Sequence, residues 1–167
     1  MTTLAQLRAF GFPDAFNQSQ GKPVLAINAA SAATVKTTNA LVFSIGGIAY
    51  TKAALAAQVL TNAVGPAGTG VYVQPISTTV YYTIAVNAAG TIKVYQGSYT
   101  GQVLGAPTPG VYGDGLVPDI ETGYAPVGGI KIVTNASATF TLGTTALDAA
   151  GVTATYADFT GPLPASF

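Results

Sequence analysis

The stretch "YYTIAVNAAGTIKVYQG", residues 81–97, decides the fold class of this chain. β-Branched and aromatic residues, which favour strands, lie on both sides of a central "NAAG". Asn and Gly readily adopt the left-handed backbone conformations of a tight turn, so the stretch predicts a β-hairpin. Both faces of its strands are moderately apolar, and we expect the second face to be covered by another sheet or by another subunit.

The same pattern recurs on either side of this hairpin. "ALVFSI" and "IAYTK" are separated by Gly46 and Gly47, which predicts a hairpin with a two-residue turn. The segment 130–142 predicts another hairpin, "IKIV" and "TFTL" around a turn at 135–137, and "VTATYADF" (152–159) predicts a final strand. Short strands spaced about ten residues apart are typical of an antiparallel β-sandwich or barrel-like domain.

Helical signals are few. "AALAAQVL", residues 53–60, is the best interior helix candidate, because alanine and leucine are strong helix formers. "TTLAQLRAF" near the N-terminus is a second short candidate. We therefore expect a mainly β fold with short helical segments, organised as an N-terminal arm (1–23), a β domain (24–160) and an exposed C-terminal tail (161–167).

The composition excludes several classes of function. Charged residues make up only 7% of the 167 residues, against roughly 25% in an average soluble protein. The formal net charge is zero and the six Lys and Arg are spread along the chain, which argues against a basic surface for nucleic acid or anionic lipid. The chain has no Cys and no His, which excludes thiolate chemistry and the usual general base near neutral pH.

Signals for membrane insertion or export are also missing from the sequence. No apolar run reaches the roughly 20 residues that span a bilayer, and the N-terminal "MTTLAQLRAFGF" lacks the pattern of a signal peptide. We expect synthesis in the cytoplasm without export by that route.

The acidic segment "GDGLVPDIETG" carries the only concentration of carboxylates, from Asp114, Asp119 and Glu121. Carboxylates with loop carbonyls bind Ca²⁺, so these three residues are the candidate metal ligands. Asp119 and Glu121 would face one way in an extended segment, which also suggests a hydrolase carboxylate pair. The plainer interpretation is a solvated loop whose side chains bind turn amides, and on that interpretation the protein needs no metal or cofactor.

Two other short motifs do not carry chemistry in this context. "SQGK" (19–22) has the spacing of a serine–lysine acylase site, but Gly21 and Pro23 break the helix that such a site requires. "GPAGTG" lacks the Lys-Ser/Thr that completes a phosphate-binding loop. We interpret the glycines of both segments as turn residues.

Tyrosines are concentrated in the central part of the chain. Exposed tyrosine rings stack on sugars, so Tyr95, Tyr99, Tyr112 and Tyr124 are candidate ligand-facing residues. The alternative is that these aromatic rings pack within sheets, where they are common.

A chain with zero net charge and two-sided apolar strands has a tendency to associate, because charge repulsion is weak and sheet edges pair readily. We expect a permanent partner, either a closed homo-oligomer or a larger shell. The aromatic residues of the arm, Phe10, Phe12 and Phe16, are candidate partner-binding residues.

Three segments together resemble the small virion structural proteins of tailed bacteriophages, of the head-decoration and head-fibre type. They contain "GIAYTK" (47–52), "NAAGTI" (87–92) and "PVGGIKI" (126–132), the last followed by a Thr-rich segment. The resemblance covers roughly residues 41–159 without the loop at 101–124. It implies a non-enzymatic decoration or cement protein, a homotrimer that binds the major capsid protein on the outer capsid surface of the virion, with no catalytic residues.

Two alternatives remain open from the sequence. The first is a receptor- or glycan-binding domain of a phage fibre that uses the four candidate tyrosines. The second is a virion-associated glycan hydrolase that uses Asp119 and Glu121.

Overall fold

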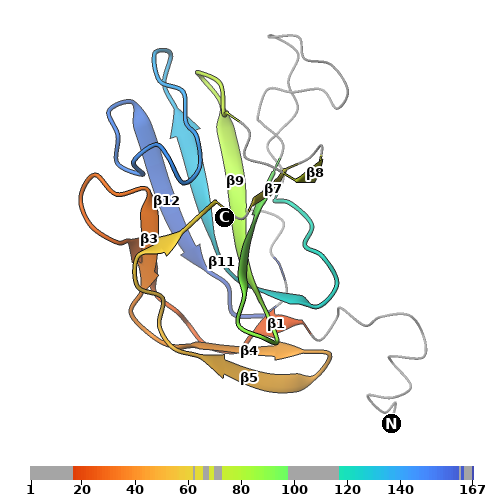
Figure 1. Cartoon of the computed structure of the whole chain (residues 1–167). Coiled ribbons are helices and arrows are strands. Elements are labelled where there is room, and N and C mark those ends of the chain that lie inside the picture. The colour runs from red at the N-terminus through yellow and green to blue at the C-terminus, as the bar shows by residue number, and fades with distance from the viewer. Residues whose placement is uncertain are drawn as a thin grey trace.

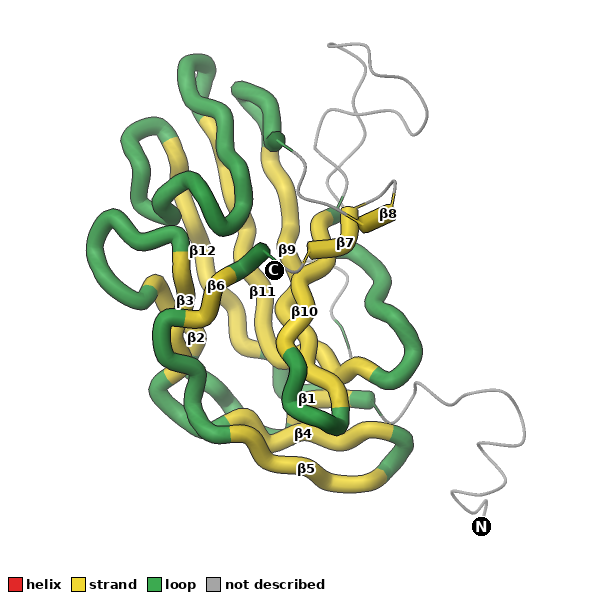
Figure 2. The backbone as a smooth tube through the Cα atoms, viewed as in Figure 1, coloured by secondary structure: helices red, strands yellow, loops and turns green. Residues whose placement is uncertain are grey.

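Three β-sheets make up the described part of the chain (Figures 1 and 2). The computed structural model describes residues 17–61, 63–65, 68–69, 73–97, 117–161, 163 and 167. The strands are β1 (Gln18–Ser19), β2 (Leu25–Ile27), β3 (Thr34–Thr37), β4 (Leu41–Ile45), β5 (Ile48–Lys52), β6 (Gln58–Val59), β7 (Ala63–Gly65), β8 (Gly68–Thr69), β9 (Thr79–Asn87), β10 (Ile92–Gln96), β11 (Tyr124–Thr134) and β12 (Val152–Asp158).

The largest sheet has six strands in the order β12-β11-β9-β10-β7-β8, and two three-stranded sheets have the orders β1-β4-β5 and β2-β3-β6. All neighbouring strands are antiparallel except β10 and β7. Figure 1 shows β2, β3 and β6 in front of the six-stranded sheet, while β4 and β5 run across its lower end. The predicted mainly β fold is confirmed, and a sandwich-like arrangement fits these layers.

The hairpin predicted in residues 81–97 is present. β9 and β10 pair from Val86 opposite Ile92 onward. The Asn87 side chain holds the turn, because its Oδ1 accepts hydrogen bonds from the backbone N–H groups of Ala89 at 3.1 Å and Thr91 at 2.8 Å. Asn therefore contributes a side-chain acceptor to the turn, in addition to its backbone freedom.

The second predicted hairpin is also confirmed. Ile45 lies opposite Ile48, and the two residues between them, Gly46 and Gly47, have φ angles of 55° and 82°. These positive values define the primed turn that matches the twist of two antiparallel strands, and glycine adopts them without steric cost. Asn17 reinforces the turn, since its Oδ1 accepts a hydrogen bond of 2.7 Å from the Gly46 N–H.

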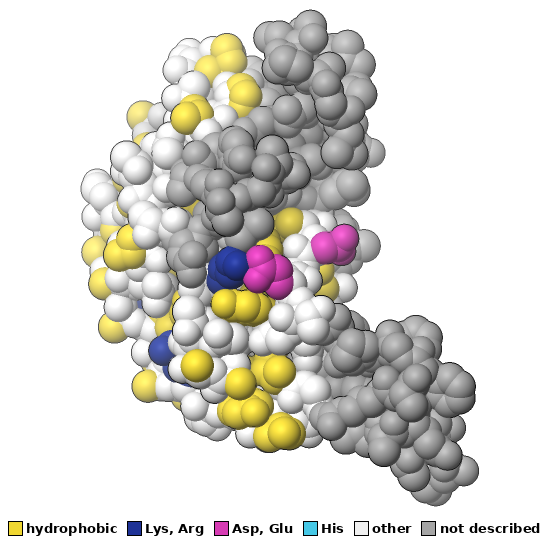
Figure 3. Space-filling view, turned by 45° about the vertical axis from the view of Figure 1, so that its right-hand side comes forward, with side chains coloured by type: hydrophobic (Ala, Val, Ile, Leu, Met, Phe, Trp, Pro, Cys, Tyr) yellow, Lys and Arg dark blue, Asp and Glu magenta, His cyan; other side chains and the backbone are white. Residues whose placement is uncertain are grey.

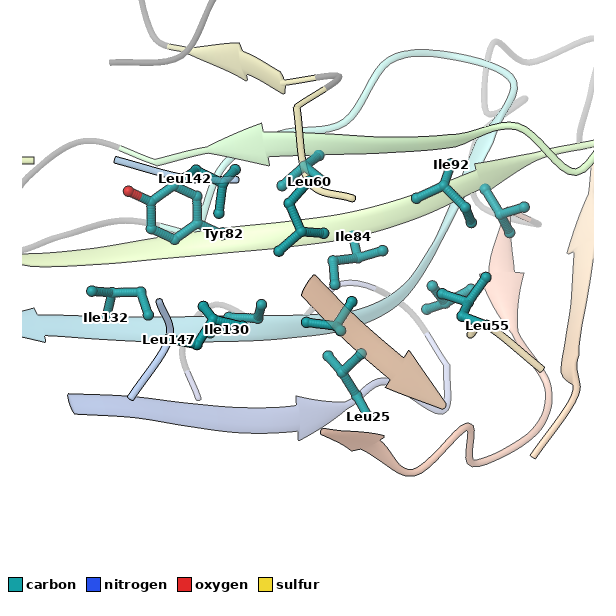
Figure 4. Packing of buried hydrophobic residues seen from close by; sticks show 14 of the residues in the cluster. Leu25, Leu55, Leu60, Tyr82, Ile84, Ile92, Ile130, Ile132, Leu142 and Leu147 are labelled. Atoms are coloured by element: carbon teal, nitrogen blue, oxygen red, sulfur yellow. The ribbon is translucent and has the colours of Figure 1, made fainter. Parts of the chain in front are cut away.

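The hydrophobic core lies between the inner face of the six-stranded sheet and the smaller sheets (Figure 4). Tyr82, Ile84 and Ile130 of β9 and β11 are fully buried there. Leu25 and Leu60 project from the opposite side toward the six-stranded sheet. The alternation of residues along β9 and β11 explains this packing, because every second side chain faces the core.

The described residues contain strands, turns and loops, and the predicted helix at residues 53–60 is wrong. Gln58 and Val59 form β6, which pairs with β3, and Ala57 has a φ angle of 49° that no α-helix contains. Leu55 and Leu60 are both buried. Pairing with β3 and burial of these two leucines outweigh the helix propensity of the alanines. The described part accordingly shows no helix long and apolar enough to cross a membrane.

The predicted pairing of "IKIV" with "TFTL" is also wrong, although the turn at 135–137 is present. β11 pairs with β9 and β12 on its two sides, so no edge is left for residues 139–142. Phe140 makes only an isolated bridge, to Gln74. The Asn135 side chain ends β11, because its Oδ1 accepts hydrogen bonds from the Ser137 and Ala138 N–H groups, both at 2.9 Å.

Both ends of the predicted β domain extend further than expected. β1 lies within the segment assigned to the arm, yet it pairs with β4, and Ser19 is buried. Gly161, assigned to the exposed tail, bridges Ser19, with the Gly161 N–H donating to the Ser19 carbonyl at 3.0 Å. Ser19 and Gly161 therefore join the two ends of the described chain through a backbone contact.

One strained residue leads to a stability prediction. Val24 has a φ angle of 58°, which is unfavourable for a β-branched residue, and its side chain is 39% exposed. Val24→Asn should raise the free energy of unfolding by about 1 kcal/mol, because Asn tolerates this conformation. Val133 is the matched control, since it is 37% exposed and lies in β11 without positive φ. Urea unfolding should show stabilisation for Val24→Asn alone, and equal effects of the two substitutions would contradict the strain.

Candidate interaction surfaces

The outer face of the six-stranded sheet is the side that points away from the core. Strand alternation and register place Tyr81 and Thr83 of β9, Tyr95 of β10, and Gly129 and Lys131 of β11 on this face. Thr83 is fully buried in the single chain, as is its neighbour two residues on, Ala85. At these positions the second face of the central hairpin is therefore covered within the chain itself.

Four residues form an ion-pair cluster on this face: Lys93, Tyr95, Glu121 and Tyr124. The Lys93 Nζ lies 2.6 Å from Glu121 Oε1 and 2.8 Å from Oε2, and it is the one ion pair within the described residues. The same ammonium lies 5.8 Å from the ring centroid of Tyr95 and 5.6 Å from that of Tyr124. Lys93 thus links the segment before β11 to β10 through charge and cation–π contacts.

Tyr95 is buried under this cluster. It is 3% exposed, and its hydroxyl makes no hydrogen bond within the part of the chain that the structure describes. Burial raises the pKa of Tyr95, and the Glu121 carboxylate adds to this effect, although the nearby Glu121 backbone N–H acts in the opposite direction. The hydroxyl therefore stays protonated. The ring contacts the edge of Tyr124 at a centroid distance of 6.2 Å and offers no open face for stacking.

The acidic residues do not gather into a metal site in the described part of the chain, where no group of three His, Cys, Asp or Glu side chains lies together. Glu121 is bound by Lys93 through both oxygens, and Asp119 is exposed. A cation competing for Glu121 would have to displace the lysine ammonium. Asp114 lies outside the described residues, as do Tyr99 and Tyr112 and the arm residues Phe10, Phe12 and Phe16.

A second aromatic group on the outer face includes Phe167. Its ring meets the edges of Tyr81 and Phe159 at centroid distances of 5.0 Å and 5.1 Å. It also occupies the space over Gly129, where a Cβ atom would lie 2.2 Å from the Phe167 Cζ. Lys131 Nζ lies 5.6 Å from the Tyr81 ring centroid. Phe167 was expected in an exposed tail, but aromatic contacts hold it on the sheet.

The β4–β5 hairpin presents an exposed surface, mainly through β5. Ile48 is 58% exposed, and Ala49 and Thr51 are also exposed, while Tyr50 is half-buried with its ring stacked on Phe43 at 5.8 Å. Figure 3 shows a face with few charged side chains, and hydrophobic side chains gather in its lower part, where Figure 1 places β4 and β5. The predicted hairpin pattern located these strands, but it could not show which of them would stay at the edge of a sheet.

The burial of Tyr156 predicts how the stability of the protein changes with pH. Desolvation, with a further contribution from the Asp148 carboxylate, raises the pKa of Tyr156 to about 12, compared with roughly 10 for tyrosine in an unfolded chain. Above pH 10 the unfolded state releases a proton that the folded state retains, so the free energy of unfolding should fall as pH rises toward 12. Urea unfolding of wild type and Tyr156→Phe between pH 8 and pH 12 measures this. The variant should lose less stability over that range, and parallel curves would show that Tyr156 does not contribute.

Comparison with known proteins gives the chain no relatives: no family model, no curated protein and no solved structure matches it.

Proposed function

We propose that this chain is a non-enzymatic structural protein of a bacteriophage virion, a capsid decoration protein that binds the outer capsid surface as an oligomer. The observation that carries the proposal is the exposed, nearly uncharged β surface of the β4–β5 hairpin. Surfaces of this kind bind other proteins through apolar contact and strand pairing. The sequence resemblance to head-decoration proteins includes the same hairpin.

The carboxylates also support a structural protein. The Asp158 carboxylate accepts a hydrogen bond of 2.8 Å from the Leu25 N–H, which ties β12 to β2. The Asp148 carboxylate accepts hydrogen bonds of 3.0 Å and 2.9 Å from the Ser31 N–H. Glu121 binds Lys93. These three carboxylates stabilise the fold, which leaves them poorly placed to act as catalytic acids or bases.

A decoration protein does not need strong individual contacts. An oligomer with several copies of one weak contact binds a repeating surface tightly, because each bound copy raises the effective concentration of the next. The near absence of charge favours contacts that depend little on salt. The partner would be the major capsid protein, and the oligomer a homotrimer.

Capsids assembled without this protein provide the test. Purified protein should co-sediment with such capsids and saturate at a fixed number of copies, and the occupied capsids should resist heat or dilution better than bare ones. Salt should change the binding little. Absence of saturable binding would refute the proposal. Deletion of residues 1–16 should reduce occupancy if Phe10, Phe12 and Phe16 face the capsid. Unchanged occupancy would show that the arm is not part of the interface.

A second candidate function is favoured by the ion-pair cluster. The half-buried Tyr124 lies beside the charged Lys93 and the exposed Glu121, and sugar hydroxyls bind to groups of these types, whereas the buried Tyr95 would only support this surface from below. A fibre domain that binds glycans would show saturable binding on a glycan array. Tyr124→Ala should abolish that binding while leaving capsid co-sedimentation unchanged. Binding to capsids without binding to any glycan would support the decoration function over the glycan-binding one.

A further inference from the structure

The outer edge of β5 has no strand beside it in the described part of the chain. β5 is the last strand of the sheet β1-β4-β5, and it pairs only with β4. Its exposed residues remain accessible with the whole chain present, Ile48 to 58%. Natural edge strands are usually protected by a proline, a bulge or several charges. β5 reads "IAYTK", pairs with β4 without a bulge, and has a single charge at its end.

The register identifies which backbone groups point outward. Ile45 and Ile48 flank a two-residue turn, so they form a hydrogen-bonded pair, and such pairs alternate along an antiparallel ladder. Residues 48, 50 and 52 therefore direct their N–H and C=O groups toward β4. Ala49 and Thr51 direct theirs toward the open edge.

We propose that this edge binds the β5 edge of a second copy of this chain, in an antiparallel arrangement with a two-fold axis at Tyr50. In this register Ala49 of one copy lies opposite Thr51 of the other. Each N–H and C=O group on the two edges then has a partner. An antiparallel shift of one residue would place inward-pointing groups at the contact, so the backbone alone selects between neighbouring registers.

The side chains fit the same register. Tyr50 faces its own copy across the axis, and cross-strand aromatic pairs stabilise sheets. Ile48 lies opposite Lys52 of the other copy, so its exposed side chain can pack on the aliphatic part of the lysine. The lysines of the two copies are not opposite each other, and the zero net charge of the chain gives no long-range repulsion. A second copy is therefore a partner that matches in backbone register, in side-chain pairs and in charge.

This inference rests on the proposed structural function, because it names one of the contacts through which copies assemble. A five-residue edge is a small interface, and the contact should be weak for two isolated molecules. Weak two-fold contacts between neighbouring oligomers become effective on a shell that holds many of them close together.

Thr51→Pro is the sharpest variant. Proline removes the outward-pointing N–H of residue 51 in both copies, while the pairing with β4 uses residues 50 and 52 and should remain. Sedimentation velocity over a concentration series should show reversible self-association of wild type. Thr51→Pro should weaken it about tenfold or more. Thr51→Val retains the N–H and a β-branched side chain, and it should associate like wild type.

Charge substitutions at Ile48 test the register independently and do not depend on proline being tolerated. Ile48→Lys places a positive charge opposite Lys52 of the other copy, and it should weaken association several-fold. Ile48→Glu places a negative charge there and should strengthen association, with the gain lost at high salt. Because Ile48 is exposed, both variants should unfold at nearly the wild-type urea concentration.

A wild-type chain that remains a monomer at all concentrations would overturn the inference. So would association beyond the proposed trimer that is as strong in Thr51→Pro and Ile48→Lys as in wild type, since another surface would then hold neighbouring oligomers together. Capsid co-sedimentation of Thr51→Pro separates this inference from the proposed function. If the self-association data refute the β5 contact while capsids still bind the protein, only the inference fails; if no form binds capsids, the proposed function fails.

Discussion

Replacing Gln74 with alanine is expected to lower the free energy of unfolding by about 3 kcal/mol, the largest effect we predict for a polar residue. Gln74 is fully buried. Its Nε2 donates hydrogen bonds of 3.1 Å to the carbonyls of Thr78 and Ile132, and its Oε1 accepts one of 3.4 Å from the Tyr82 hydroxyl. Alanine would leave a cavity and would remove the Gln74 amide as a hydrogen-bond donor to both carbonyls, although the Thr78 carbonyl keeps its 3.0 Å bond from the Thr134 N–H.

The reason for the size of this effect is the position of Gln74 between strands that are distant in sequence. Its backbone pairs with Phe140, and its side chain donates to the carbonyls of Thr78, just before β9, and of Ile132 in β11. Gln58→Ala is the matched control, since the Gln58 amide is exposed and donates only to the adjacent Val59 carbonyl. Urea unfolding should show a change under about 0.5 kcal/mol for Gln58→Ala. Equal effects of the two substitutions would show that the buried amide is not important for stability.

Gly129→Ala is expected to lower the free energy of unfolding by about 2 kcal/mol. The added Cβ would lie 2.2 Å from the Phe167 Cζ and 2.8 Å from the Phe159 Cζ, so the rings on the outer face would have to move. Gly21→Ala is the control, because its Cβ would meet Val42 at an ordinary 3.5 Å and Gly21 has no positive φ. That substitution should be neutral or slightly stabilising.

A double-mutant cycle with Phe167→Ala tests the cause of the Gly129 effect. Without the Phe167 ring, the closest contact of the new Cβ is removed, so Gly129→Ala should cost about 1 kcal/mol less in the Phe167→Ala background. Additive effects of the two substitutions would show that Phe167 does not occupy the space over Gly129 in solution.

The two aromatic groups and the β5 edge divide the surface of the molecule into different roles. Phe167 and the ion-pair cluster cover the outer face of the six-stranded sheet, and they make that face part of the chain's own packing. β5 remains open. The proposed assembly through β5 would therefore need no rearrangement of the six-stranded sheet.

The hairpins at 41–52 and 79–96 could be predicted because both strands and their turn lie within a few residues of each other. Gly-Gly and "NAAG" are local signals, and the structure uses both as expected. Pairings between distant segments were not predictable in this way. The partners of β11 are β9 and β12, which the sequence pattern could not distinguish from the closer "TFTL".

The candidate surfaces show the same division. Tyr95 and Tyr124 were recognised as aromatic residues, but only the fold placed Lys93 and Glu121 against them, and only the fold buried Tyr95. Phe167 could not be assigned to the sheet from sequence, because its contact with Tyr81 joins two residues that are far apart along the chain. The buried position of Gln74 likewise depends on segments far apart in the chain.

By itself, the sequence determined a mainly β protein with few charges, no Cys and no His, since composition and turn residues act through local or average properties of the chain. Only the tertiary structure decided which strands pair, which aromatic rings are buried and which edge stays open. Those outcomes depend on the burial of side chains from segments that are distant in sequence. A local sequence pattern does not indicate which distant segment buries the most apolar surface, so it cannot predict these pairings.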